Sequence, residues 1–382
     1  MRGHAPEYTA RVGNDYRDRV QRMLWISAIF AAATFIGAGA LLLREARAGD
    51  HFDFVGWEAE ALPNRWLYRL GAPLRQDIPE DEALSRYFAL NDRSSPEALR
   101  LENIAEAVIE ERISIVLREA GIGWPLPMFL GGVWPPVDME LAASPRVLVV
   151  SPRGRIERER TEPLRPDLGT ADAVRIEREV EGDGARSALV VATGGIATYP
   201  SIVATGDGYA DTVSAAAHEW VHHYLAPYPL GRAYFATREA ETINETVADA
   251  VGNEVASLAI ERWGLPGAPP PASAAGPRTD ADRVFRDLRT EVDTLLAAGR
   301  VDDAERRMEA VRGELERNGL RIRRINQAYF AWYGTYAARP DSVDPLGRQV
   351  RSVRERAESL GAFIEVMRGV ATRAEVVRLA GE

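Results

Sequence analysis

The chain has 382 residues, of which 46% are hydrophobic, and is therefore long enough to bury a core of ordinary size. Its formal net charge is -10 and its 47 basic residues are all Arg, without the clustered positive face that binds nucleic acid, so we expect no nucleic-acid partner. Because Cys is absent, disulfides, a thiolate zinc site and a thiol nucleophile are excluded, and any metal must be held by His and carboxylate side chains.

The first predicted element is an uncharged apolar run over residues 23–43. At about 1.5 Å per residue it forms a helix about 32 Å long, enough to cross a bilayer core. Arg is more frequent before this run than after it. We therefore expect a cytoplasmic tail over residues 1–22 and a single-pass transmembrane helix that anchors an extracytoplasmic domain in the cell membrane. The alternatives are a signal peptide cleaved near Ala46-Arg47-Ala48 and a buried helix of a soluble core.

The next region, residues 50–145, is expected to be helical, with a segment rich in Pro and Trp. Residues 95–97 read Ser-Pro-Glu, an N-cap followed by a proline and an acid in the first turn, and Gly121 is a typical helix end. They predict a long helix from Pro96 to about Ala120. The segment Gly123–Pro136 predicts a loop that packs on its own domain, lines a substrate groove or rests on lipid headgroups.

Residues 146–263 are expected to form the core that carries the chemistry. Val147–Val150 and Leu189–Val191 are β-branched runs typical of strands, and Gly194–Tyr199 is a candidate edge strand. These segments predict a small mixed sheet directly before the chemical motif.

The part of the chain beyond this core is expected to be helical. Residues 264–279 are rich in Pro and Ala and predict a linker. Two apolar stripes of helical period, separated by Gly299, predict a helical hairpin over residues 280–320, and a C-terminal helical region follows over residues 321–382. The whole pattern predicts an α+β fold that is predominantly helical.

The strongest chemical signal is an HExxH pentapeptide, since residues 218–222 read His-Glu-Trp-Val-His. An acid at Asp211 and a run of Ala precede it, and both favour a helix. Four residues are slightly more than one helical turn, so His218 and His222 project from one face and can hold one ion, with Glu219 beside a metal-bound water. Such a site needs a third ligand.

Residues 242–249 read Thr-Ile-Asn-Glu-Thr-Val-Ala-Asp, with an Asn-Glu pair followed by an Asp one turn later. With the pentapeptide before it, this segment resembles the second motif helix of the gluzincin, or thermolysin-like, zinc metallopeptidases, and the resemblance covers roughly Thr193 to Asn253. It implies a zincin-like core with one Zn²⁺ ion, Glu245 as the third ligand, and Asp249 accepting a hydrogen bond from a ligand His. Glu239 and Glu241 are alternative acids, but neither has the Asn before it and the Asp after it.

The resemblance also implies a mechanism in which Glu219 takes a proton from a metal-activated water and passes it to the leaving amine. In the family, a Tyr or His from a downstream helix commonly stabilises the oxyanion. Tyr333 is our candidate for this role, with Tyr329 and Tyr336 as alternatives, although each of them can instead be a structural aromatic. His223 faces away from the other two His on a regular helix, so we expect a partly exposed or hydrogen-bonded ring.

The predicted function is that of a membrane-anchored, zinc-dependent metallopeptidase that acts on a peptide or protein substrate. An edge strand before the motif could pair with the backbone of an extended peptide. The alternative is a membrane-tethered, non-catalytic zinc-binding scaffold or interaction protein that recruits a partner through its helical hairpin. Glu219 favours the enzyme, because a structural site has no use for a base. The pattern favours neither internal cleavage nor cleavage from the N-terminus, and no oligomeric state.

Overall fold

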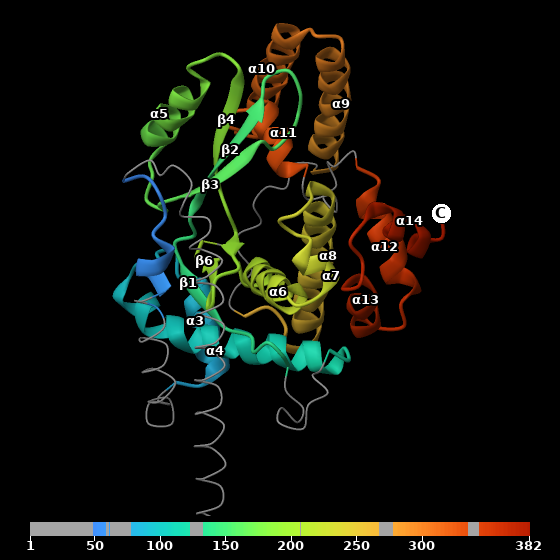
Figure 1. The fold of residues 1–382 in the computed structure, drawn as a ribbon. Helices are drawn as coiled ribbons and strands as arrows, with labels where there is room; N and C mark the ends of the chain where they lie inside the picture. Colours follow the sequence, from blue (N-terminus) through green and yellow to red (C-terminus); the bar gives the residue numbers. More distant parts are fainter. Residues whose placement is uncertain are drawn as a thin grey trace, which may run out of the picture. The chain divides into compact units, whose positions relative to one another are not determined.

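The computed structural model describes residues 49–58, 61, 78–122, 133–206, 208–266, 278–334 and 344–382. The chain divides into two compact units: the first comprises residues 1–49, 53–77 and 198–200, and the second comprises residues 50–52, 78–197 and 201–382. In the first unit, residues 54–58 are helical, and the Thr198 hydroxyl donates a hydrogen bond to the Pro200 carbonyl at 2.7 Å. The second unit holds all the labelled helices and strands (Figure 1).

The prediction of a transmembrane helix is corrected. No helix within the described ranges is long and apolar enough to cross a membrane. Three of them, α4 (Pro96–Glu119), α8 (Arg238–Trp263) and α9 (Arg278–Ala297), have the length, but charged residues recur along all three. Residues 23–43, on which the prediction fell, lie outside the described residues.

One of the two sheets of the second unit is mixed and has the strand order β1-β6-β5. Strand β1 (Met139–Ala142) is parallel to β6 (Ser201–Ala204), which is antiparallel to the edge strand β5 (Gly195–Ile196). Two buried carboxylates of α4 cover the other edge of the sheet, because Glu106 accepts a hydrogen bond from the Leu141 N–H at 2.7 Å and Glu110 one from the Met139 N–H at 2.9 Å. Buried backbone donors require such partners, so α4 fixes this sheet.

The other sheet is antiparallel, with the order β3-β2-β4. Its strands are β2 (Arg146–Pro152), β3 (Arg160–Leu164) and β4 (Arg186–Ala192). Val147 and Val149 point into an apolar cluster with α9, α10 and α11, whereas Leu148 and Val150 point into a cluster with α5. Helices cover both faces of this sheet (Figure 1), which explains why the residues of β2 form a continuous apolar run in the sequence. The two predicted strand segments therefore pair with each other, in a sheet separate from that of β5.

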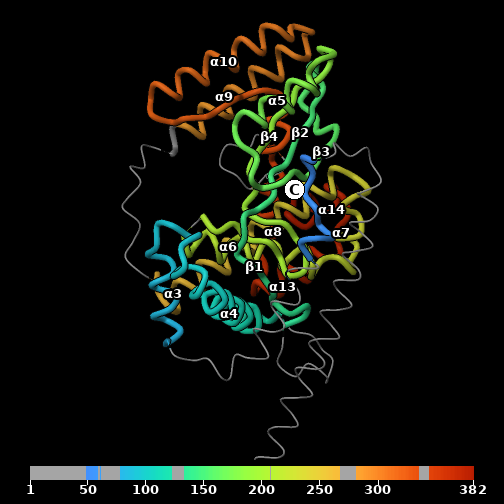
Figure 2. Tube along the Cα trace, turned by 90° about the vertical axis from the view of Figure 1, so that its left-hand side faces the viewer, coloured from blue at the N-terminus to red at the C-terminus, as the bar shows by residue number. Residues whose placement is uncertain are grey.

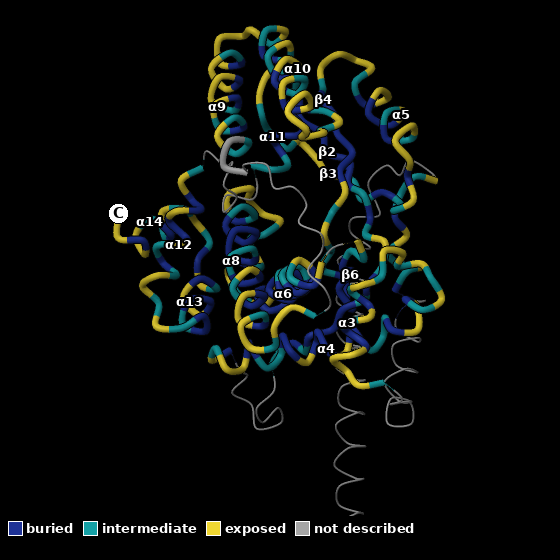
Figure 3. The backbone as a smooth tube through the Cα atoms, turned by 180° about the vertical axis from the view of Figure 1, so that it is seen from behind, coloured by how far each residue is buried: buried dark blue, intermediate teal, exposed yellow. Residues whose placement is uncertain are grey.

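Helices pack on both faces of this antiparallel sheet. Their bounds are α5 (Thr170–Glu181), α9 (Arg278–Ala297), α10 (Val301–Arg317) and α11 (Gln327–Tyr333). Helices α9 and α10 run side by side as the predicted hairpin (Figure 2), and Gly299, with a φ of +72°, ends α9 in a conformation that favours glycine. Figure 3 shows that many residues along α9 are exposed.

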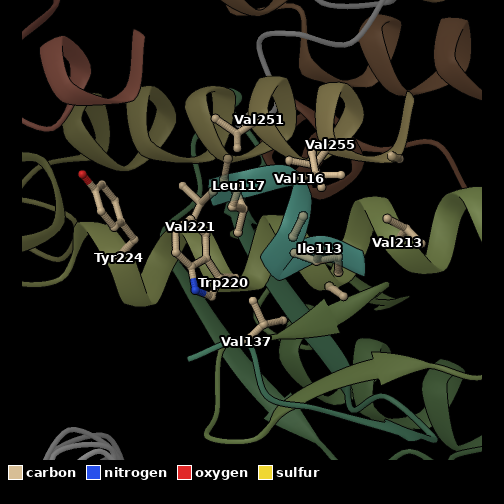
Figure 4. Packing of buried hydrophobic residues seen from close by; sticks show 14 of the residues in the cluster. Ile113, Val116, Leu117, Val137, Val213, Trp220, Val221, Tyr224, Val251 and Val255 are labelled. Atoms are coloured by element: carbon tan, nitrogen blue, oxygen red, sulfur yellow. The ribbon is translucent and has the colours of Figure 1, made fainter. Parts of the chain in front are cut away.

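The main apolar core lies among α4, α6 (Tyr209–Leu225) and α8. The helix predicted from Pro96 is α4, and the Ser95 hydroxyl caps it by accepting from the Ala98 N–H at 3.2 Å. Figure 4 shows how side chains of the three helices interlock: Ile113 and Leu117 from α4, Val213 and Val221 from α6, and Val251 and Val255 from α8. This core holds α6 and α8, the two helices that carry the predicted ligands.

The remaining helices of the second unit are short or peripheral. They are α3 (Glu80–Ala89), α7 (Pro229–Arg232), α12 (Leu346–Arg356), α13 (Leu360–Met367) and α14 (Arg373–Ala380). Apolar residues of α3, α12, α13 and α14 join the main core. The described part of the chain is thus mostly helical with small sheets, which confirms the α+β class.

Candidate metal centre

Helix α6 brings the two His of the pentapeptide together. The helix begins at Tyr209 after Gly208, and Asp211 lies in its first turn, where an acid favours the helix dipole. His218 and His222 lie on successive turns, with their rings edge-to-face at 4.8 Å between centroids and their Nε2 atoms 3.0 Å apart. The two ring nitrogens therefore point to one place.

Helix α8 supplies the third group. One oxygen of Glu245 lies 3.3 Å from the His218 Nε2, and the other lies 3.7 Å from the His222 Nε2. Ligands about 2.1 Å from a tetrahedral zinc are about 3.4 Å from one another. His218, His222 and Glu245 each offer a ligand atom within 4.8 Å of the others, so they could hold a metal ion. The donor set of two imidazoles and a carboxylate fits such an ion.

The other nitrogen of each ring is held by α8 as well. The His218 Nδ1 lies 3.0 Å from an Asp249 oxygen, and the His222 Nδ1 lies 2.8 Å from the Asn244 side-chain oxygen. When each Nδ1–H donates to its oxygen, each Nε2 keeps a lone pair for a metal. Asn244 completes this support. The sequence showed Asn244 directly before Glu245, but only Asp249 was expected to support a His ring.

Tyr234 is a further residue of the site, which sequence reasoning missed. It lies in the turn between α7 and α8, and its hydroxyl donates a hydrogen bond to Glu245 at 2.5 Å. Its ring is edge-to-face with that of His222, at 5.7 Å between centroids. The only sequence signal was a Tyr between the two motifs, and the loop conformation decides where such a residue points.

Glu219 is 7% exposed and lies against strand β5. A Cβ at Gly195 would be 2.7 Å from a Glu219 oxygen and 2.8 Å from the Ile202 carbonyl, so only glycine lets the strand approach this closely. Burial raises the pKa of Glu219 to about 7, against the opposing effect of His218. A carboxylate with such a pKa can accept a proton near neutral pH and release it again.

The pKa values of the three ligand groups show what the cluster holds when no cation is bound. Burial raises the pKa of Glu245, but His222, His218 and the hydrogen bond from Tyr234 bring it to about 2. Burial lowers the pKa of His218, but hydrogen bonds to Asp249 and Glu245 outweigh it and the pKa rises well above its usual value. Burial lowers the pKa of His222. The negative Glu245 carboxylate beside the two rings favours a positive charge at this place, and a bound cation would displace any proton held there.

Gly252 sets the spacing between the two ligand-bearing helices. A Cβ at this position would lie 2.6 Å from the Ser214 carbonyl oxygen and 3.2 Å from the His218 backbone nitrogen. These atoms belong to the backbone of α6 and cannot rotate away. The close crossing permits Glu245, two turns before Gly252, to reach both imidazoles.

The remaining candidates lie elsewhere. Tyr333 packs on the cluster of β2, β4 and α9–α11, with its ring 4.6 Å from that of Tyr329, and Tyr336 lies outside the described residues. The role of Tyr333 stays a prediction, while Tyr234 contacts two of the three groups that could hold a metal ion. Glu241 pairs with Arg158, which leaves Glu245 as the acid at the two His. His223 is buried.

Comparisons with models of protein families, with curated proteins and with solved structures find no match to this chain. The resemblance to the gluzincins therefore depends on the two motifs and on the geometry of the residues that they contain.

Proposed function

We propose that this protein is a zinc-dependent metallopeptidase of the gluzincin type, with a zincin-like core made by the mixed sheet, α6 and α8. The observation that carries the proposal is the convergence of His218, His222 and Glu245 beside a buried carboxylate that is not a ligand. Three protein ligands leave one position of a tetrahedral zinc open, which is typical of catalytic sites, whereas structural sites are closed by four.

Bound zinc would act as a Lewis acid and make water acidic enough to ionise near neutral pH. Glu219 is the general base: its pKa of about 7 suits it to take a proton and later to protonate the leaving amine. Bound zinc would lower that pKa, because an adjacent cation favours the carboxylate. Tyr234 holds the Glu245 carboxylate in place through its hydroxyl.

The position of β5 favours a peptide as the substrate. This strand is at the edge of its sheet and passes directly over Glu219. An extended peptide that lies beside this strand would have a peptide bond next to the base. A non-catalytic zinc scaffold has no need of a buried base beside an edge strand, so the structure supports the enzyme better than the scaffold.

The test combines metal content with hydrolysis of a peptide library by the wild-type protein and the Glu219→Gln variant. We expect one zinc per chain in both proteins, hydrolysis by the wild type, and a loss of about a thousandfold or more in kcat for the variant. Zinc binding without hydrolysis by the wild type would favour the scaffold. Retained turnover in Glu219→Gln would remove Glu219 from the role of base.

A further inference from the structure

Phe235 has an unusual position for a large apolar residue. It is 85% exposed, the highest value among the exposed large hydrophobic residues within the described ranges. A singly exposed apolar side chain is common on protein surfaces and needs no explanation by itself. The residue next to it, however, is Tyr234, which contacts two of the three metal ligands.

The turn that carries Phe235 is held by hydrogen bonds on both sides. The N–H of Ala236 donates to the Ala233 carbonyl at 2.9 Å, and the N–H of Thr237 donates to the same oxygen at 3.2 Å. Thr237 then caps α8, since its hydroxyl accepts from the Ala240 N–H at 3.1 Å. The backbone beside Phe235 is thereby hydrogen-bonded, and its exposed side chain extends from this turn.

Three aromatic rings form a row that leads outward from the metal centre. The rings of His222 and Tyr234 are at 78° to one another, and those of Tyr234 and Phe235 are at 71° with 4.8 Å between centroids. Both contacts are edge-to-face, an arrangement in which aromatic rings attract one another beyond their apolar area. Phe235 is the outermost ring of the row and leaves most of its surface for another group.

The charged side chains next to this turn already have partners. The Arg232 guanidinium donates to the Pro227 carbonyl, at 2.9 Å from its Nε, and Arg238 lies 3.4 Å from a carboxylate oxygen of Glu157. The large apolar group exposed at this place is the ring of Phe235, which favours an apolar ligand.

We propose that Phe235 forms a subsite for an aromatic side chain of the substrate, in a residue close to the scissile bond. This inference rests on the proposed peptidase function. An aromatic side chain docked on Phe235 extends the row of rings by one, and an aliphatic side chain of similar size gains only the apolar contact.

The experiment uses peptides that differ only in having Phe, Leu or Ser at one position, placed in turn on either side of the cleaved bond. In the wild type, we expect kcat/KM to be highest for Phe. In Phe235→Leu, the Phe-to-Leu ratio falls about fivefold, because the ring contact is lost while an apolar side chain remains. In Phe235→Ala, the Phe-to-Ser ratio falls roughly tenfold. The matched control is Leu99→Ala, at a residue of α4 that is 56% exposed, and it keeps both ratios.

A binding measurement separates failure of this inference from failure of the proposed function. Fluorescence anisotropy measures how tightly the labelled Phe and Leu peptides bind, and it does not depend on turnover. The proteins compared are zinc-loaded Glu219→Gln and the double variant that also carries Phe235→Leu. If Glu219→Gln binds the Phe peptide more tightly than the Leu peptide, and the double variant does not, the subsite is supported even if the wild type hydrolyses no peptide. Unchanged Phe-to-Leu ratios in Phe235→Leu, in binding or in hydrolysis, would overturn the proposal.

Discussion

Substituting Gly252 by Ala is expected to weaken both the fold and the metal centre. The added methyl group would lie 2.6 Å from the Ser214 carbonyl oxygen, whereas an unstrained contact is about 3.5 Å, so α6 and α8 must separate by several tenths of an ångström. Overpacking of a tight core costs about 1–3 kcal/mol, and Ala returns up to about 1 kcal/mol of helix propensity. We expect a net loss of roughly 1–2 kcal/mol in the free energy of unfolding.

The metal centre is more sensitive than the fold to this separation. Ligand distances in zinc sites are set within about 0.2 Å. The two His belong to α6 and Glu245 belongs to α8, so a separation of these helices changes the distances between them. We therefore expect zinc affinity to fall at least about tenfold, comparable to the loss of a supporting residue around a metal site.

The matched control is Gly313→Ala in α10, where a Cβ meets nothing within 4 Å. That variant should be stabilised by up to about 1 kcal/mol, with unchanged zinc affinity. Urea denaturation of the metal-free proteins and competition with a zinc chelator measure the two quantities. If Gly252→Ala matches Gly313→Ala in both, the close crossing has no part in building the site.

Three further predictions concern individual residues of the site. Gly195→Ala should bind zinc normally but lose most of its peptidase activity, because its methyl group would meet the Glu219 carboxylate; full activity would mean that β5 does not constrain the base. Tyr234→Phe should reduce zinc affinity about three- to tenfold by removing the hydrogen bond to Glu245, as measured by chelator competition, and an unchanged affinity would show that this contact does not support the ligand. The pKa of Glu245 in the metal-free protein is about 2, below its ordinary value of 4.5, so its ionised form stabilises the fold above pH 4.5, and this stability is lost as the pH falls towards 2. The stability difference between the metal-free wild type and Glu245→Gln should shrink over that range, and a difference that is constant with pH would refute the assignment.

Local patterns predicted helices α4 and α6 and the three groups that the structure brings together. The Ser-Pro-Glu cap at 95–97 specifies the start of α4, and the four-residue spacing of His218 and His222 follows from helix geometry alone. Glu245 was found because its neighbours formed a recognisable motif. In each case the signal lies within a few residues of the feature that it determines.

Features that depend on distant parts of the chain were not predictable in this way. Strands β1 and β6 have four residues each and pair in parallel across about sixty residues, so their partners cannot be read from either segment. Helix α5 was also missed. The roles of Tyr234 and Gly252 come from a loop conformation and a helix crossing, neither of which leaves a periodic pattern.

The role of Tyr333 as the oxyanion-stabilising residue stays a prediction, and it too depends on distant parts of the chain. Tyr333 was the candidate in the sequence, with Tyr329 and Tyr336 as alternatives, and the structure packs Tyr333 and Tyr329 on an apolar cluster against β2 and β4. Aromatic side chains bury large areas and serve cores more often than sites. Which tyrosine approaches the metal ligands was decided by the path of the chain after α7.

Anomalous diffraction at the zinc edge, from crystals of the zinc-loaded protein, shows whether two imidazoles of α6 and one carboxylate of α8 hold one ion with a position left open. We expect a single strong peak about 2.0–2.2 Å from the His218 Nε2, the His222 Nε2 and a Glu245 oxygen, with a fourth ligand that is not a protein side chain. A peak elsewhere, or a fourth side chain closing the coordination sphere, would contradict the proposed metal centre.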